Sequence, residues 1–170
     1  TSADAFSVAE GTDSVATLTG SDAEGDSVSF SSVLAGTDAA DFTLTAGGVL
    51  AFKATPNFEA PADADTNNVY SIIATITDGT NPSTQAITIT VTDTNDESPV
   101  LSVSTPYSVA EGTDAVATVT AADADANSTI TYTLSGTDAA DFDINSASGV
   151  ITFAITPDFE DPADADTDNS

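Results

Sequence analysis

Acidic side chains at short, regular spacing are the residues of this chain best suited to chemistry. They occur in DTNDESP at residues 93–99, in two copies of VAEG that place Glu10 and Glu111, and in AADADA at residues 121–126. These segments offer carboxylate, amide and backbone oxygens and little else. Calcium binds six to eight such oxygens, whereas magnesium prefers fewer protein ligands and more water. The acidic segments therefore predict calcium binding.

The side chains that the sequence lacks narrow this chemistry further. The chain has no His and no Cys, and Lys53 is its one basic residue. Zinc, copper and iron–sulfur sites need nitrogen or sulfur ligands, so these sites are excluded. Catalysis would have to rest on a pair of carboxylates, and no such pair is singled out by its position. We therefore expect no enzymatic activity.

A second acidic pattern is PADADTNN, which starts at Pro61 and recurs as PADADTDN from Pro162. Asp63 and Asp65 alternate there as the ligands of Asp-x-Asp calcium loops do. In the second copy the matching acids are Asp164, Asp166 and Asp168. The Gly and the downstream Glu of an EF-hand are missing. An independent calcium site and a solvated turn are therefore both open interpretations of this loop.

The charge of the chain limits its partners. There are 28 acidic residues against one basic residue, which gives a formal net charge of -27. Nucleic acids and anionic membranes attract Lys and Arg, so neither is an expected partner. The sequence contains no long apolar run and no signal peptide, so we expect no membrane insertion by this segment. Without Cys or an initiator Met, it is typical of an internal piece of a secreted or cell-surface protein that metal ions stabilise.

Internal repeats divide the chain into two domains. SVAEGTD occurs at Ser7 and Ser108, GTDAADF at Gly36 and Gly136, and TP-x-FE at Thr55 and Thr156. An offset of 100 to 101 residues is the size of a whole domain. We expect one complete repeat at residues 1–98 and a second at residues 99–170 that lacks its last two strands. Either the chain continues, or strands of a neighbouring chain complete the second repeat.

The elements that must position these acids are β-strands. Apolar residues alternate with Thr at Ile87, Ile89 and Val91, and similar alternation marks residues 130–134 and 151–155. Clusters of Gly, Asn, Asp and Pro separate such runs. About seven short strands in each complete repeat predict an all-β, immunoglobulin-like Greek-key sandwich. We expect an aromatic core and a solvent-facing position for Asp38 and Asp41. The expected core aromatics are Phe30, Phe42, Phe52, Tyr70, Tyr107, Tyr132, Phe142 and Phe153.

The motifs and their order resemble the cadherin repeat. Its signatures are Val-x-Glu in the first strand, Asp-x-Glu before the sixth strand, the linker Asp-x-Asn-Asp-x-x-Pro, and Ala-x-Asp-x-Asp early in the next repeat. The resemblance covers all of the first repeat and everything present of the second. It implies a cadherin-type sandwich and three calcium ions at the junction between successive repeats. The composition, rich in Thr, Ser, Ala and Asp, is closest in style to bacterial surface adhesins.

The resemblance also implies which residues bind calcium. At the junction inside this chain they are Glu10, Glu59, Asp93, Thr94, Asn95, Asp96, Glu97, Asp123 and Asp125. Thr94 and Glu97 would contribute backbone carbonyls. Asn57 stands where the motif has Asp, which removes one charge. The residues that would bind ions at a preceding junction are Asp22, Glu24 and Asp78, and those at a following junction are Glu111, Asp158 and Glu160.

Calcium at such a junction would change the mechanics of the chain. Two carboxylates about 4 Å apart repel by roughly 4 kcal/mol at an effective dielectric constant near 20. Clustered acids would therefore separate the repeats, and bound cations would draw them together. We expect a loosely jointed string without calcium and a stiff rod with it. Dissociation constants on the order of 0.1 to 1 mM are typical of extracellular modules.

These observations favour a structural or adhesive segment of an extracellular repeat protein, with neighbouring repeats, like chains or cell-surface ligands as partners. A salt-adapted surface would scatter acids over the strands, whereas here Thr and Ser take the outward strand positions. Two alternatives remain. One is a subunit of a self-assembling extracellular filament in which a donated strand completes the second repeat. The other is a carbohydrate-binding module, although no exposed aromatic platform is evident.

Overall fold

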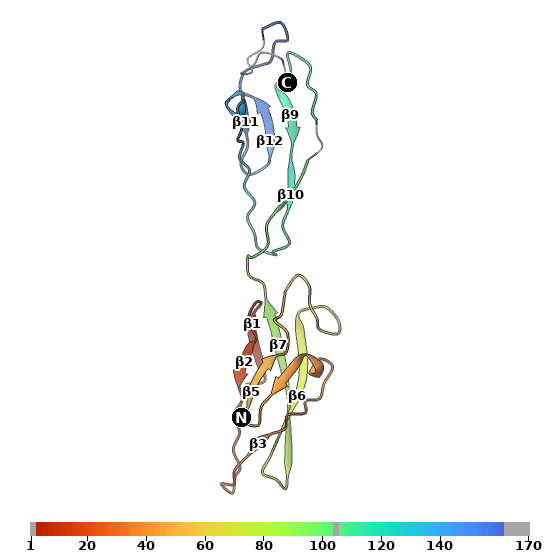
Figure 1. The fold of residues 1–170 in the computed structure, drawn as a ribbon, viewed down its shortest axis with the longest axis vertical. Helices are drawn as coiled ribbons and strands as arrows, with labels where there is room; N and C mark the ends of the chain where they lie inside the picture. Colours follow the sequence, from red (N-terminus) through yellow and green to blue (C-terminus); the bar gives the residue numbers. More distant parts are fainter. Residues whose placement is uncertain (1–2, 104–105, 162–170) are drawn as a thin grey trace. The chain divides into compact units, whose positions relative to one another are not determined.

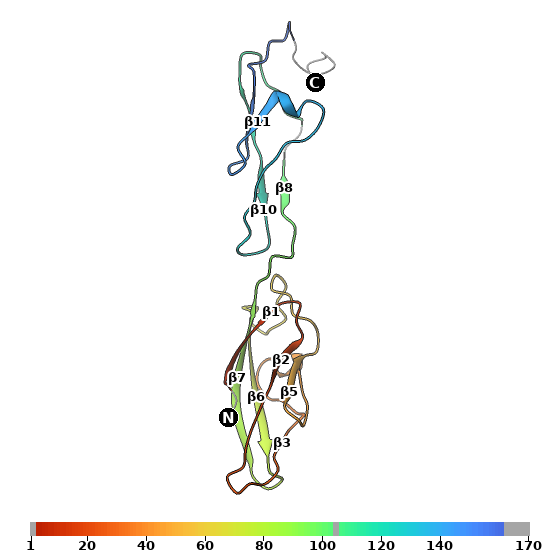
Figure 2. The same ribbon diagram turned by 90° about the vertical axis from the view of Figure 1, so that its left-hand side faces the viewer.

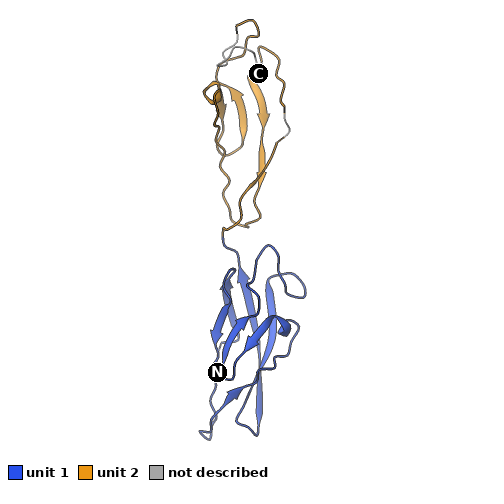
Figure 3. Cartoon of the chain, in the orientation of Figure 1, with its two compact units in different colours: residues 1–94 blue, residues 95–170 orange. Residues whose placement is uncertain are grey.

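The computed structural model describes residues 3–103 and 106–161. It divides the chain into two compact units, Thr1–Thr94 and Asn95–Ser170, which Figure 3 shows in blue and orange. The division lies in the acidic segment DTNDESP, which also contains the expected boundary after Ser98. The second copy of the PADAD motif, with Asp164, Asp166 and Asp168, lies outside the described residues. Each unit is considered by itself below.

Unit 1 is a sandwich of two β-sheets, as Figure 1 and Figure 2 show from two sides. One sheet has the strand order β1-β7-β6-β3 and the other the order β2-β5-β4. The strands are β1 (Ala5–Ala9), β2 (Ser14–Thr17), β3 (Ser29–Phe30), β4 (Phe42–Leu44), β5 (Val49–Phe52), β6 (Val69–Thr77) and β7 (Pro82–Thr92). A single 3-10 turn, η1 (Ala39–Asp41), precedes β4. The seven-stranded Greek-key prediction is confirmed.

The core of unit 1 fills the space between its two sheets. Ile87, Ile89 and Val91 of β7 are buried, and the intervening threonines point outward or lie at the edge of the core. Phe42 and Phe52 pack with ring centroids 4.4 Å apart. Tyr70, only 1% exposed, meets both rings edge-on at 5.5 and 5.2 Å. The predicted alternation and aromatic core are therefore confirmed for this unit.

The expectation that Asp38 faces solvent is wrong. Its side chain is only 4% exposed. The carboxylate accepts hydrogen bonds from the backbone N–H of Ala64 at 2.9 Å and of Ser71 at 2.7 Å. A buried N–H group needs an acceptor, and here one carboxylate serves both the PADAD loop and strand β6. Asp41 is half-buried.

Unit 2 repeats one sheet of unit 1 residue for residue. Its strands are β8 (Val100–Ser102), β9 (Ala115–Thr118), β10 (Thr120–Ala122), β11 (Phe142–Ile144) and β12 (Val150–Phe153), with the 3-10 turn η2 (Ala139–Asp141). The sheet β11-β12-β9 matches β4-β5-β2 of unit 1. Ile151 pairs with Ala117 as Leu50 pairs with Ala16, and both sheets share the same register shift. A smaller sheet pairs β8 with β10.

The strand expected at residues 130–134 does not form a ladder in unit 2. Burial still alternates along it, with Ile130, Tyr132 and Leu134 half-buried and the residues between them exposed. The matching strand in unit 1, β3, is held by β6, and the second repeat has no counterpart of β6 in this sequence. A strand needs a partner for its backbone N–H and C=O groups, so this segment does not join a sheet.

For the same reason, the aromatic core predicted for the second repeat is only half formed. Phe142 and Phe153 pack together at 4.8 Å, but both are half-buried where Phe42 and Phe52 are buried. Tyr107 is exposed. The prediction that these residues form a buried core is therefore wrong in degree, because it assumed a second sheet to cover them.

Candidate metal centre

Glu10 follows β1 and joins three segments of unit 1. Its side chain is 5% exposed. One carboxylate oxygen accepts the backbone N–H of Phe58 at 2.6 Å, and the other accepts the backbone N–H of Thr94 at 2.8 Å and the Thr94 hydroxyl at 3.2 Å. Burial acts to raise the pKa of Glu10, but these hydrogen bonds outweigh it and lower the pKa. Glu10 is therefore a fixed, ionised carboxylate.

Two further carboxylates converge on Glu10 within unit 1. Glu59 lies in the loop before β6, Asp93 directly follows β7, and both are half-buried. One oxygen from each of the three side chains lies within 4.8 Å of the others. At that separation each pair of charges repels by about 3.5 kcal/mol at an effective dielectric constant near 20. A divalent cation bound by these oxygens would turn that repulsion into attraction, and hard cations prefer this donor set.

The start of unit 2 presents a second group of candidate ligands. Asp125 is 4% exposed and accepts the backbone N–H of Glu97 at 3.1 Å. Its own N–H donates to Asp123 at 3.0 Å. Burial raises the pKa of Asp125 and the charge of Asp123 adds to this, against hydrogen bonds from the backbone of Asp96 and Glu97 that lower it. Asn95, Asp96 and Glu97 are exposed.

Three acids of the second repeat also come together, and two of them, Glu111 and Glu160, match Glu10 and Glu59. Glu111, Asp158 and Glu160 place carboxylate oxygens within 4.8 Å of one another, and all three are exposed. Glu111 accepts the N–H of Phe159 at 3.2 Å, which reproduces the bond from Phe58 to Glu10. The two units thus share the hydrogen bond that joins this Glu to the TP-x-FE segment.

Asn57 occupies the place of Asp158 in the first repeat, and its side chain makes a local turn. Its amide oxygen accepts the N–H of Ala60 at 2.6 Å, as Asp158 accepts the N–H of Glu160 at 3.0 Å. Both residues therefore fix their loop, and only Asp158 adds a negative charge to it.

The residues assigned to a preceding junction are engaged in turns of unit 1. Asp22 accepts the N–H of Glu24 at 2.8 Å, and Asp78 accepts the N–H groups of Thr80 and Asn81, both at 2.6 Å. Backbone bonds from Asn81 and Thr80 lower the pKa of Asp78. Within residues 3–103 and 106–161, no group of three converging acids includes Asp22, Glu24 or Asp78.

The PADAD loop of unit 1 is organised around Asp63. This side chain is 3% exposed, and it accepts the N–H of Asn67 at 2.8 Å and of Asn68 at 3.1 Å. Burial would raise the pKa of Asp63, but these bonds lower it, whereas the hydrogen bond to Asp63 raises the pKa of Asp65. Thr66 and Asn68 adopt left-handed backbone conformations, with φ of 57° and 63°. The loop geometry is accounted for by Asp63 acting as its internal acceptor.

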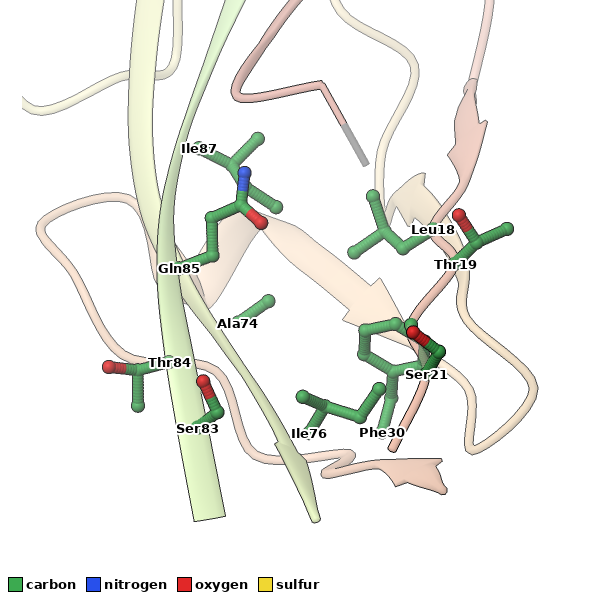
Figure 4. A pocket seen from close by; sticks show the side chains of 11 residues that line it. Leu18, Thr19, Ser21, Phe30, Ala74, Ile76, Ser83, Thr84, Gln85 and Ile87 are labelled. Carbon is green, nitrogen blue, oxygen red and sulfur yellow. The ribbon is translucent and has the colours of Figure 1, made fainter. Parts of the chain in front are cut away.

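A cavity of about 400 Å³ lies in unit 1, between the β6–β7 hairpin and the segment from Leu18 to Ser21. Figure 4 shows that Leu18, Phe30 and Ile76 line it together with Thr, Ser and Gln side chains. None of the 11 lining residues carries a charge, so the cavity offers no acid or base for catalysis and no strong metal ligand.

Comparison with known proteins identifies the fold. No protein-family model matches the sequence, and no curated protein matches it. The structure is similar to the crystal structure of human protocadherin-24 EC1-2, with a TM-score of 0.73 and 18% identity over 93% of this chain and 76% of that chain. The sandwich is thus of the cadherin-like type.

Two further solved structures agree with this assignment. Mouse cadherin-23 EC22-24 gives a TM-score of 0.67 at 20% identity, over 94% of this chain and 54% of that chain. Drosophila N-cadherin EC1-4 gives 0.67 at 22% identity, over 97% and 40%. The chain therefore has the cadherin extracellular fold. Among the described residues, no helix is long and apolar enough to cross a membrane.

Proposed function

We propose that this chain is a calcium-dependent structural and adhesive segment of an extracellular or cell-surface repeat protein. The observation that carries the proposal is the convergence of Glu10, Glu59 and Asp93 within unit 1. This oxygen-only group occurs in a chain with the cadherin extracellular fold, which the similar proteins use in tandem repeats. The lack of Cys favours a bacterial surface adhesin as the parent protein.

In this proposal, calcium ions link successive repeats. The first repeat contributes the carboxylates of Glu10, Glu59 and Asp93. The linker contributes Asn95 and Asp96 with the backbone carbonyls of Thr94 and Glu97, and the second repeat contributes Asp123 and Asp125. Support comes from their order in the sequence and from the hydrogen bonds that already fix Glu10 and Asp125. With the ions bound, the junction becomes stiff and the segment projects as a rod.

Calorimetric titration of the 170-residue chain with calcium, and separately with magnesium, tests ion binding. We expect saturable calcium binding with a dissociation constant on the order of 0.1 to 1 mM and clearly weaker magnesium binding. Asp93→Asn should weaken calcium binding by about tenfold, because it removes one charge from the three-acid group. Asp26→Asn is the matched control, since Asp26 is an exposed acid of the same unit outside that group.

Small-angle scattering with calcium and with chelator tests the stiffening. We expect a larger radius of gyration and a larger maximum interatomic distance with calcium. The proposal fails if calcium is not bound, or if Asp93→Asn and Asp26→Asn bind it equally. If calcium binds and the scattering does not change, the chain has a calcium site but calcium does not stiffen the junction.

A further inference from the structure

Asn68 is a buried polar residue between the PADAD loop and β6 of unit 1. Its side chain is 8% exposed. Burying an amide is costly unless its polar atoms find partners. The side-chain nitrogen donates a hydrogen bond to the backbone oxygen of Phe58 at 2.9 Å. The side-chain oxygen is buried and accepts no hydrogen bond from the residues that the structure describes. The bond to Phe58 is therefore the contact that fixes this amide.

The backbone of Phe58 is held at both its N–H and its C=O group. The N–H donates to Glu10 at 2.6 Å, and the oxygen accepts from Asn68 at 2.9 Å. That oxygen belongs to the peptide group that joins Phe58 to Glu59, and the Glu59 carboxylate is one of the three that converge in unit 1. A ligand on a loop keeps its place only where the surrounding residues fix its backbone. The two bonds on Phe58 therefore fix the backbone from which Glu59 reaches the three-acid group.

The backbone of Asn68 is itself fixed by the PADAD loop and by β7. Its N–H donates to Asp63 at 3.1 Å, and its oxygen accepts the N–H of Val91 at 2.9 Å. Its φ of 63° is a left-handed conformation, which Asn tolerates better than most residues other than Gly. The loop and the strand thus hold Asn68 in place, while its side chain holds Phe58.

We propose that Asn68 is a positioning residue for the metal centre, which holds Glu59 in the three-acid group through the backbone of Phe58. Asn68 contributes no ligand itself. It keeps the loop that carries Glu59 ordered before the ion arrives, so that less ordering accompanies binding. The inference rests on the proposed function, because its consequence is measured as calcium affinity. A residue that supported the fold alone would leave the calcium affinity of the folded chain unchanged.

Titration of Asn68→Gly and Thr66→Gly with calcium, followed by nuclear magnetic resonance, tests the proposal. Gly keeps the left-handed conformation and removes the amide, so Asn68→Gly should weaken calcium binding by about tenfold. Thr66→Gly is the matched control and should bind calcium as the parent chain does, because Thr66 is an exposed residue of the same loop with φ of 57°. Asn68→Ser, whose side chain is one atom shorter, should weaken binding in the same way and serves if Asn68→Gly does not fold.

Glu59→Gln separates the positioning of Glu59 from a general effect on unit 1. If Asn68 acts through Glu59, the double variant of Glu59→Gln and Asn68→Gly should bind calcium within about twofold of Glu59→Gln alone. If Asn68 acts on unit 1 in some other way, the two losses of affinity should multiply. Urea denaturation in chelator establishes that each variant is folded under the conditions of the titration.

Hydrogen exchange in chelator follows the loop without calcium. Exchange of the Phe58 N–H should be about tenfold faster in Asn68→Gly than in the parent chain, and unchanged in Thr66→Gly. Unchanged exchange in Asn68→Gly, equal calcium affinity of Asn68→Gly and the parent chain, or multiplied losses in the double variant would each overturn this inference and leave the proposed function in place. If the parent chain binds no calcium, the proposed function fails and this inference fails with it.

Discussion

Asp38 shows how a single buried carboxylate joins a loop to a strand of a sheet. It accepts backbone N–H groups from Ala64 and Ser71, and thereby connects the PADAD loop to β6. Asp38 directly precedes the turn η1. The N–H of Asp41, in that turn, donates a hydrogen bond to the backbone oxygen of Asp38 at 3.0 Å. At the residue scale, unit 1 thus depends on acids that serve as internal acceptors rather than as surface charges.

Asp38→Ala should lower the free energy of unfolding of unit 1 by about 2 to 4 kcal/mol, because it leaves two N–H groups without their acceptor. Urea denaturation measures the change, and hydrogen exchange of residues 62–71 assigns it to this unit. Asp26→Ala, which removes an exposed acid, is the control and should change the free energy by less than about 0.5 kcal/mol. A similar loss for both variants would contradict this role of Asp38.

Asp41 makes a distinct pH prediction at the same scale. Burial raises its pKa, the charges of Asp38 and Asp63 add to this, and Lys53 opposes it. A raised folded-state pKa means that the ionised form is disfavoured in the folded chain, so the contribution of this group to stability falls as pH rises through that pKa. Asp41→Asn should therefore stabilise unit 1 at pH 7 by less than about 1 kcal/mol.

This gain should disappear as the pH falls to about 3, where the Asp41 carboxyl of the parent chain is protonated. Thermal unfolding of both chains across this pH range measures the difference between them. Glu10 and Asp78 have lowered pKa values, so they contribute to stability with the opposite pH dependence. Both chains contain these two residues, so their contribution cancels in the difference. If the stabilisation by Asp41→Asn increased as the pH fell, the predicted pH dependence would be wrong.

At the scale of elements, the same three-stranded sheet occurs in two surroundings. Leu50 in β5 and Ile151 in β12 occupy the same register position, but Leu50 is fully buried and Ile151 is half-buried. The difference comes from the second sheet, since β6 and β7 cover Leu50, and the described residues of unit 2 include no counterpart of these strands over Ile151. Identical local pairing therefore contributes differently to the stability of the two units.

Leu50→Ala should cost about 3 to 5 kcal/mol and Ile151→Ala about 1 to 2 kcal/mol, because a cavity forms only where neighbours surround the side chain. Urea denaturation, with hydrogen exchange followed separately in each unit, measures both losses. If a copy of residues 70–96 is added after Ser170, the loss in free energy of unfolding caused by Ile151→Ala should rise toward the loss caused by Leu50→Ala. Equal losses of stability for the two variants in the parent chain would contradict the role of the second sheet in burying Leu50.

At the scale of the whole molecule, net charge is the dominant property. A formal charge of -27 on 170 residues produces self-repulsion that disfavours the compact state. The acids are also grouped, since Glu10, Glu59 and Asp93 meet in unit 1, and Glu111, Asp158 and Glu160 meet in unit 2. Screening by salt and specific binding of a divalent cation should both relieve this repulsion, but with different dependence on concentration.

In chelator, raising NaCl from about 0.02 to 0.5 M should raise the unfolding temperature by several degrees, because the screening length falls from about 20 Å to about 4 Å. Calcium should act at millimolar concentration, saturate, and leave a smaller response to NaCl. Differential scanning calorimetry at matched ionic strength, with magnesium as the control ion, separates the two effects. Destabilisation by NaCl would contradict the dominance of self-repulsion.

The sequence by itself determined the features that depend on local periodicity and composition. Alternation at Ile87, Ile89 and Val91 specified a strand with one buried face, and the clustering of acids in loops specified oxygen donors without nitrogen or sulfur. The repeat of GTDAADF specified the same turn and strand in both units, which η1 with β4 and η2 with β11 confirm. These features follow from neighbouring residues, so a sequence pattern can express them.

Only the tertiary structure decided which groups meet across long separations. It buried Asp38 against residues 64 and 71, and it brought Glu10, Glu59 and Asp93 together from three segments of unit 1. It also left residues 130–134 without a ladder, although their alternation is as regular as that of β7. Periodicity states which face of a strand is apolar, but hydrogen bonding and burial depend on a partner distant in sequence, and that partner is a property of the fold.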